Sequence, residues 1–380
     1  MYSHLAPTYQ RLFGEQWVLW FASSNRYSVV DLSFKGCLDA YLASDTPDGF
    51  DSEITSHINN SSAKDLAATL YNYLNQCHST TQTVEETAID LDTSKRCITK
   101  YYHFNGVDFK IHFDCELVVK TIHPSIAYLE IDQFAQAKAP TVFDIYLKDD
   151  LLQLFKDGSL VKKVPKRDYH LIQGKFIMEL LCSLTQTKES DWIAALHGST
   201  VADGNAAIML IGESGKGKST LTALLAASGF QMVADDVSPL HYKTRHIYNN
   251  PAAISIKAGA FSVLEAYIAN LDGIAPVVFN IRKGPIKYVP FPRPSKPHYP
   301  CNTIVLVDYK TDAKAQLEKI DIATVLETLI PDSWIAPDKP KAKAFLDWLE
   351  RVSTYRLTYS KTADAITQIS ELFQNQNSKK

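Results

Sequence analysis

The sequence predicts an α/β protein that is built around one strand–loop–helix unit and preceded by a small α+β domain. The apolar run Ala206–Ile211 leads into a glycine-rich segment, and the helix-compatible run Thr220–Ser228 follows and stops at Gly229. Near the N-terminus, two strand-like segments precede apolar residues at helical spacing. A chain of 380 residues has room for two or three such domains.

Composition excludes several classes of protein. A formal charge of -3 argues against general nucleic-acid binding, which needs an excess of Lys and Arg. The 6 cysteines form no CxxC pair of the kind that binds zinc or acts as a redox dithiol. No secretory signal and no apolar run of roughly 18 residues is visible, so we expect a cytoplasmic protein that does not enter a membrane.

The first domain is predicted to cover residues 1–80. Gln16–Ala22 and Arg26–Val30 alternate as two strands across the polar turn Ser23–Asn25. Helical spacing follows at Phe34–Leu42 and Leu66–Leu74, with a shorter helix at Ser52–Ile58. The polar segment His78–Glu86 has no periodicity and is the expected linker, with a boundary near Glu85.

The rest of the chain is predicted to hold an accessory region, a core domain and a tail. Residues 88–190 form the accessory α/β region, with strands at Cys97–Phe104, Asp108–Phe113 and Leu117–Lys120 and a helix at Ile172–Leu184. Residues 191–373 form the core domain, in which Asp203-Gly204 turns a hairpin between Ala194–Ala202 and Asn205–Ile211. It also contains a strand at Thr303–Val307 and a helix at Ala342–Leu349, and we expect residues 374–380 to be frayed.

The glycine-rich segment satisfies G-x-x-x-x-G-K-[ST] between a strand and a helix, the context that a P-loop requires. In such a loop, glycines let backbone N–H groups turn toward phosphate, a lysine neutralises the β and γ oxygens, and a hydroxyl binds Mg²⁺. A glycine-rich turn without a ligand is the alternative. The residues expected to bind ATP are Gly212, Ser214, Gly215, Lys216, Gly217, Lys218, Ser219 and Thr220, with Ser219 also on the metal.

A pair of carboxylates follows the next predicted strand. Gln231–Ala234 delivers Asp235 and Asp236, which we expect to point to opposite faces. One would face the phosphates, while its neighbour serves the metal through water or braces the loop. A carboxylate beside Mg²⁺ and a γ-phosphate accepts a hydroxyl proton in a kinase. The alternative is a metal-binding aspartate followed by a turn, as in a simple ATPase. His197 is expected on the strand beside the P-loop strand, where it projects toward the phosphates or is an ordinary core histidine.

Three segments in this order resemble bacterial HPr kinase/phosphorylase: Leu196-His197-Gly198, the loop Gly212–Ser219, and Val233–Asp236. The resemblance implies a P-loop core related to phosphoenolpyruvate carboxykinase, with ATP, Mg²⁺ and a hydroxyl acceptor. It also implies that Asp235 is the general base, that Asp236 associates with the metal, and that Lys218 and His197 contact phosphate. Homo-oligomers are common among such relatives.

Two further segments carry weaker resemblances. Ile254–Lys257 is similar to a lysine-bearing strand of HPr-kinase-related proteins encoded beside peptide-modification genes, which makes Lys257 a phosphate or acceptor contact, and Lys287–Pro290 is similar without an assigned role. Trp17–Cys77 resembles small, winged-helix-like PqqD domains that bind leader peptides by strand addition. A dimerisation or covering domain is the alternative.

The chain departs from the HPr enzymes because it lacks their acidic-Ile-Arg-Gly segment, so the expected acceptor is not HPr. The hypothesis is an ATP- and Mg²⁺-dependent kinase acting on a Ser or Thr hydroxyl of a peptide or protein, with a natural-product precursor peptide as one candidate. A small-molecule kinase and a non-catalytic nucleotide switch or ATPase are the alternatives. Guanine specificity is disfavoured because no N-K-x-D segment is present.

Overall fold

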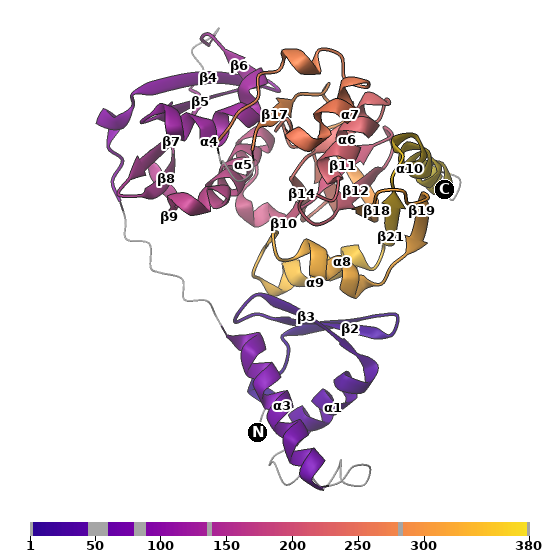
Figure 1. The fold of residues 1–380 in the computed structure, drawn as a ribbon. Helices are drawn as coiled ribbons and strands as arrows, with labels where there is room; N and C mark the ends of the chain where they lie inside the picture. Colours follow the sequence, from indigo (N-terminus) through magenta and orange to yellow (C-terminus); the bar gives the residue numbers. More distant parts are fainter. Residues whose placement is uncertain (1–2, 45–59, 80–88, 135–138, 280–283, 378–380) are drawn as a thin grey trace. The chain divides into compact units, whose positions relative to one another are not determined.

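The computed structural model describes residues 3–44, 60–79, 89–134, 139–279 and 284–377 (Figure 1). The helix predicted at 52–58 and most of the predicted linker lie outside these residues. The chain divides into two compact units. The first comprises Met1–Val84, Asp321–Glu327 and Ile335–Arg351, and the second comprises Glu85–Ile320, Thr328–Trp334 and Val352–Lys380.

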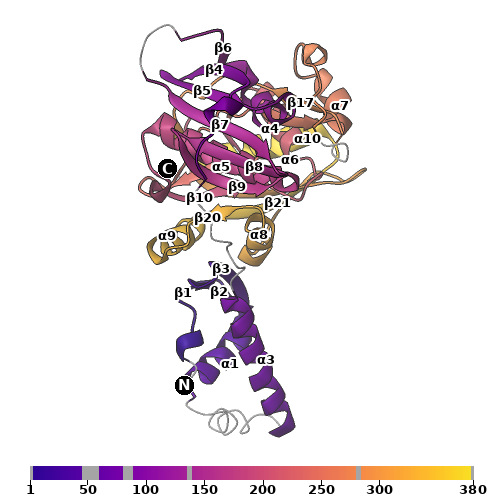
Figure 2. The ribbon, with the colours of Figure 1, turned by 90° about the vertical axis from the view of Figure 1, so that its left-hand side faces the viewer.

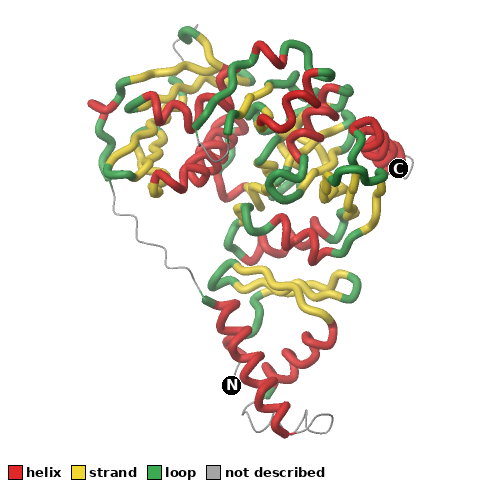
Figure 3. The backbone as a smooth tube through the Cα atoms, viewed as in Figure 1, coloured by secondary structure: helices red, strands yellow, loops and turns green. Residues whose placement is uncertain are grey.

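The first unit is a small antiparallel sheet packed on helices (Figure 3). Its strands are paired in the order β1 (Tyr9–Phe13), β2 (Gln16–Phe21) and β3 (Arg26–Asp31). Its helices are α1 (Leu32–Ala43), α3 (Asn60–His78) and α9 (Lys339–Leu349). The two predicted strands and flanking helices are present, whereas β1 was missed because its polar sequence YQRLF gives no strong apolar signal.

Local chemistry explains where the elements of this unit begin and pack. The Asp31 carboxylate caps α1 by accepting a hydrogen bond from the Phe34 amide at 2.7 Å. Buried apolar side chains from the sheet and the helices form one core, which includes Leu19, Phe21, Leu38, Leu70 and Leu74. Burial of these side chains, at about 25 cal/mol per Å² of apolar surface, stabilises the unit.

The second unit contains a six-stranded sheet with the order β6-β4-β5-β7-β8-β9, whose main strands lie side by side in Figure 2. The strands are β4 (Ile98–Phe104), β5 (Val107–Phe113), β6 (Glu130–Ile131), β7 (Thr141–Lys148), β8 (Leu151–Lys156) and β9 (Ser159–Pro165). The helices α4 (Glu116–Ile126) and α5 (Tyr169–Thr185) pack against it.

The strand predicted at Leu117–Lys120 is wrong, because these residues belong to α4. A four-residue window rich in valine looks like a strand. The buried positions Val118, Ile122 and Ile126 instead recur every four residues along the helix, with the Val119 side chain beside them.

A larger mixed sheet contains the strand that leads into the glycine-rich segment Gly212–Ser219. Its order is β13-β11-β12-β18-β15-β14-β10-β20, and β21 pairs with both β18 and β19. Its strands are β10 (Trp192–His197), β11 (Ser199–Ala202), β12 (Ala207–Ile211), β13 (Gln231–Ala234), β14 (Val237–His241), β15 (His246–Tyr248), β18 (His298–Tyr309), β19 (Gln316–Lys319), β20 (Trp334–Ile335) and β21 (Ser353–Tyr359). The helices α6 (Lys218–Ala227) and α10 (Thr362–Asn377) pack on it, and α8 (Ile322–Leu329) precedes β20.

Two short strands, β16 (Ile254–Lys257) and β17 (Ile286–Val289), form a separate antiparallel pair near α6 and α7 (Phe261–Glu265). At the C-terminus the structure differs from the prediction, because α10 continues through Asn377 where a frayed tail was expected from Gln374. Among the helices of the described residues, none combines the length and apolar character needed to cross a bilayer.

Candidate functional site

The segment Gly212–Gly217 connects β12 to α6, and two of its residues adopt backbone conformations that favour glycine. Gly215 and Gly217 have φ values of +91° and +90°, in the left-handed region where a side chain is strained. A Cβ on Gly217 would also lie 3.1 Å from the Tyr359 hydroxyl oxygen. We call Gly212–Ser219 the glycine-rich loop. Its predicted strand and helix are both present, and Thr220 lies in the first turn of α6.

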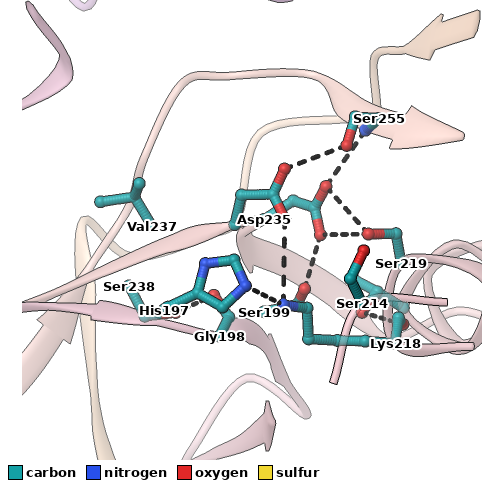
Figure 4. Close-up of polar contacts among 12 residues, drawn as sticks. His197, Gly198, Ser199, Ser214, Lys218, Ser219, Asp235, Val237, Ser238 and Ser255 are labelled. Carbon is teal, nitrogen blue, oxygen red and sulfur yellow. Dashed lines mark hydrogen bonds and ion pairs between the residues drawn. The ribbon is translucent and has the colours of Figure 1, made fainter. Parts of the chain in front are cut away.

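Lys218 begins α6 and is buried, with 7% of its surface exposed. Its ammonium Nζ donates a hydrogen bond to His197 Nε2 at 2.9 Å and lies 3.9 Å from Asp236 Oδ1 (Figure 4). A buried ammonium needs negative partners, and one half-exposed carboxylate at this distance is a weak one. Lys218 is therefore suited to an additional anion at the N-terminus of α6, where the helix dipole also favours negative charge.

His197 lies on β10, and this differs from the prediction. β10 pairs with β14, whereas β11 is the strand beside β12. The predicted apolar run Ala194–Ala202 therefore contains two strands, separated at Gly198, where a Cβ would lie 3.1 Å from the Leu210 carbonyl oxygen. Burial and the charge of Lys218 lower the pKa of His197, so the imidazole is neutral. Its Nε2 accepts the hydrogen bond that Lys218 Nζ donates.

Asp235 is the most enclosed carboxylate of the site, with 3% of its surface exposed. Its Oδ1 accepts hydrogen bonds from Ser199 Oγ at 2.5 Å and Ser219 Oγ at 3.2 Å, and its Oδ2 accepts one from the Ser255 amide at 3.1 Å (Figure 4). Burial, followed by the negative charge of Asp236, raises the pKa of Asp235 to about 7. This carboxyl group therefore changes its protonation state near neutral pH.

Asp236 extends past the end of β13 in a left-handed conformation with φ of 57°. Asp is one of the few residues that tolerate this conformation. The turn interrupts the strand alternation, so the two carboxylates do not point to opposite faces as expected. Asp236 Oδ2 accepts a hydrogen bond from Ser255 Oγ at 3.0 Å, and its side chain is 49% exposed.

Lys257 links β16 to the glycine-rich loop. Its Nζ donates a hydrogen bond to Ser214 Oγ at 2.9 Å, and both residues are exposed. Lys216, in the same loop, has its Nζ 3.5 Å from Asp308 Oδ1. The structure thus brings together the predicted residues His197, Lys218, Ser219, Asp235 and Asp236 in one hydrogen-bonded group, with Lys257 held at the loop.

Two serines in this group were missed in the sequence. Ser199 precedes Asp235 by 36 residues and donates the shortest hydrogen bond that Asp235 accepts. Ser255 contacts both carboxylates. Serine is too common for either to stand out. The only available signal was that Ser255 lies two residues before Lys257, and positions two apart share a face of a strand.

The residues present fit a Mg²⁺–nucleoside triphosphate. The buried Lys218 at a helix N-terminus is suited to phosphate. No cluster of three or more His, Cys, Asp or Glu side chains suited to a metal occurs within the described residues. Mg²⁺ does not need one, because it commonly binds through one or two protein oxygens, substrate phosphates and water. Ser219 and Asp236 would supply such oxygens.

Among the comparisons with known proteins, matches occur among the solved structures. No family model and no curated protein matches the chain. Among solved structures, the Hpr(Ser) kinase/phosphatase from Coxiella burnetii matches over 49% of this chain and 97% of that chain, with 14% sequence identity and a TM-score of 0.21. A TM-score this low supports no conclusion about fold or activity.

Proposed function

We propose that this protein is an ATP- and Mg²⁺-dependent kinase that transfers the γ-phosphate to a Ser or Thr hydroxyl of a peptide or protein. The observation that carries this proposal is the position of Asp235. A carboxyl group with a pKa near neutrality is hydrogen-bonded to Ser219, the hydroxyl that follows the lysine of the glycine-rich loop. A base with a pKa close to the working pH is the most effective for proton transfer.

The residues of the loop bind and orient the phosphates in this proposal. Lys218 donates to the β and γ oxygens, and Lys257 approaches the same loop from β16 through Ser214. Neutral His197 accepts from Lys218 at 2.9 Å and so fixes the direction of the ammonium. Ser219 and Asp236 would hold Mg²⁺, which would neutralise phosphate charge.

Asp235 acts as the general base. The acceptor oxygen forms a bond to the γ-phosphorus, the bond from that phosphorus to the β–γ bridging oxygen breaks, and ADP leaves. The acceptor's hydroxyl proton passes to Asp235. The contacts of Ser219 Oγ with Asp235, at 3.2 and 3.5 Å, are the longest that this carboxylate makes. The acceptor hydroxyl would therefore take the place of Ser219 Oγ beside Asp235. Ser199 and the Ser255 amide keep the carboxylate in place.

A second candidate function is a nucleotide switch or simple ATPase, and the same Ser219–Asp235 hydrogen bond favours it. A carboxylate that is hydrogen-bonded to the hydroxyl after the loop lysine can hold a metal-bound water without acting as a base. Under this alternative Asp235→Asn weakens binding of Mg²⁺–ATP, whereas under the kinase proposal it abolishes transfer while the nucleotide still binds.

The first unit is the proposed site for recruitment of a peptide. Among the strands that the structure describes, β3 pairs only with β2, so its other edge offers backbone groups for a further strand. A peptide bound there by main-chain hydrogen bonds would be held while its hydroxyl reaches the glycine-rich loop. A ribosomally made precursor peptide is the proposed class of partner.

Intact-mass spectrometry tests the function. The protein is incubated with Mg²⁺, ATP and the peptides encoded beside its gene, and we expect a mass gain of one phosphate that Asp235→Asn removes. Asp90→Asn is the matched control, because Asp90 is exposed in the segment before β4, outside the strands and helices that carry the site. Tight nucleotide binding without any phosphorylated peptide would reject the peptide kinase and favour a small-molecule acceptor or a switch.

A further inference from the structure

The strand pair β16–β17 has two faces. One face packs in the core, and the other points to the site. On the core face, Ile254, Ile256 and Val289 are buried with side chains of α6 and α7. Lys287 is also buried, and its Nζ donates a hydrogen bond to the Leu271 carbonyl at 2.9 Å. The core face therefore uses alternate positions of each strand, as a pleated strand requires.

The intervening positions of β16 reach the site. Ser255 donates to both aspartates, and Lys257 donates to Ser214 of the glycine-rich loop. In the antiparallel register, Ser255 is paired with Tyr288. Directly opposed residues project from the same face of an antiparallel pair, so Tyr288 lies on the face that carries the contacts to Asp235 and Asp236.

Tyr288 differs from a core tyrosine in its surroundings. It is half-buried, whereas its neighbours Lys287 and Val289 point into the core. Burial, then the charge of Asp236 and the nearby Tyr169, raise the pKa of Tyr288 to about 12. The phenol therefore keeps its proton at physiological pH and is a hydrogen-bond donor near Asp236.

We propose that Tyr288 binds the acceptor. Its hydroxyl donates a hydrogen bond to a main-chain carbonyl oxygen beside the residue that is phosphorylated, and its ring forms one wall of the acceptor's path to Asp235. This inference rests on the proposed kinase function and deepens it. The face formed by Ser255, Lys257 and Tyr288 then has two tasks, because Lys257 holds the glycine-rich loop while Tyr288 holds the acceptor.

The chemistry of this face indicates what it accepts. A protonated phenol near the charge of Asp236 favours a neutral group with acceptor oxygens, and that negative charge disfavours an acidic residue next to the phosphorylated hydroxyl. An acceptor peptide is therefore expected to carry neutral or basic residues beside its Ser or Thr. A small alcohol without a neighbouring carbonyl would lose the contact with Tyr288.

The test compares Tyr288→Phe with the wild-type protein, on a synthetic peptide library that has a central Ser and degenerate flanking positions. Loss of one hydrogen bond to bound substrate is expected to raise KM for the peptides about tenfold. The dissociation constant for a non-hydrolysable ATP analogue, measured in the presence of Mg²⁺, is expected to be unchanged. Tyr267→Phe is the matched control, because Tyr267 is 42% exposed after α7 and the substitution removes the same hydroxyl group.

Each result decides between the proposals. Equal peptide kinetics for Tyr288→Phe and the wild type would overturn the acceptor role and leave the kinase proposal standing. A matched loss of nucleotide affinity in Tyr288→Phe would also overturn it, because the residue would then support the glycine-rich loop. Failure of the wild type to phosphorylate any library member would overturn the peptide-kinase proposal, and the acceptor role with it.

Discussion

Replacement of Asp235 by Asn is expected to stabilise the nucleotide-free protein at neutral and alkaline pH while it abolishes phosphate transfer. The ordinary pKa of an aspartate is 3.8, and burial with the charge of Asp236 raises the pKa of Asp235 to about 7 in the folded state. A group whose folded pKa lies above its unfolded value contributes stability at low pH, which is lost as pH rises toward the folded pKa. An amide of the same shape carries no such penalty.

The magnitude follows from the two pKa values. One pKa unit corresponds to about 1.4 kcal/mol, so between pH 5 and pH 8 the wild type loses about 3 kcal/mol relative to Asp235→Asn. The amide can keep the existing contacts, because its oxygen accepts from the Ser255 amide and its NH₂ donates to the hydroxyl oxygens of Ser199 and Ser219.

The assay is chemical denaturation of wild type and variant, without nucleotide, at pH 5 and pH 8. The measured quantity is the change with pH in the difference between their free energies of unfolding, which cancels all other titrating groups. Asp308→Asn is the control: burial alone would raise the pKa of Asp308, but the hydrogen bonds and charges of Lys310 and Lys216 together lower it. Asp308 is thus ionised in both states across this range, and its difference is expected to stay constant. A change below about 0.5 kcal/mol for Asp235→Asn, or one of opposite sign, would refute the raised pKa on which the base assignment depends.

Three further results are expected. Lys218→Met removes the ammonium that faces the phosphates and should weaken binding of Mg²⁺–ATP about 10- to 100-fold in calorimetry. Gly217→Ala places a Cβ at φ +90°, 3.1 Å from the Tyr359 hydroxyl oxygen, and should weaken nucleotide binding at least about tenfold by the same method. The kcat/KM for the peptide should fall about tenfold per unit as pH drops below about 7, the pKa of Asp235, because protonation removes the base.

Each of these expectations has a result that contradicts it. Unchanged nucleotide affinity in Lys218→Met would contradict the proposal that the glycine-rich loop binds the phosphates. For Gly217, the control is Gly174→Ala within α5, where an added Cβ meets no atom within 4 Å, and equal behaviour of the two variants would contradict the strained-loop argument. A pH profile that is flat from 5 to 8 would exclude Asp235 as the base.

Secondary structure was predictable where the signal is local. The strand before the glycine-rich loop, the helix after it and the stop at Gly229 follow from periodicity and glycine chemistry over some twenty neighbouring residues. The strand predicted at Leu117–Lys120 is wrong, because four residues are too few to separate strand from helix. The single strand predicted at Ala194–Ala202 is also wrong, because no residue marks the break at Gly198 as a change of strand partner.

Sequence by itself determined which atoms of the candidate site are available: a glycine-rich loop, a lysine, a hydroxyl and two adjacent carboxylates, all close along the chain. Tertiary structure decided how they behave. Ser199 and Ser255 come from separate strands to hold Asp235, and burial between them raises its pKa to about 7. Burial and the pairing of strands depend on contacts between residues that are distant in the chain, and no local pattern encodes them.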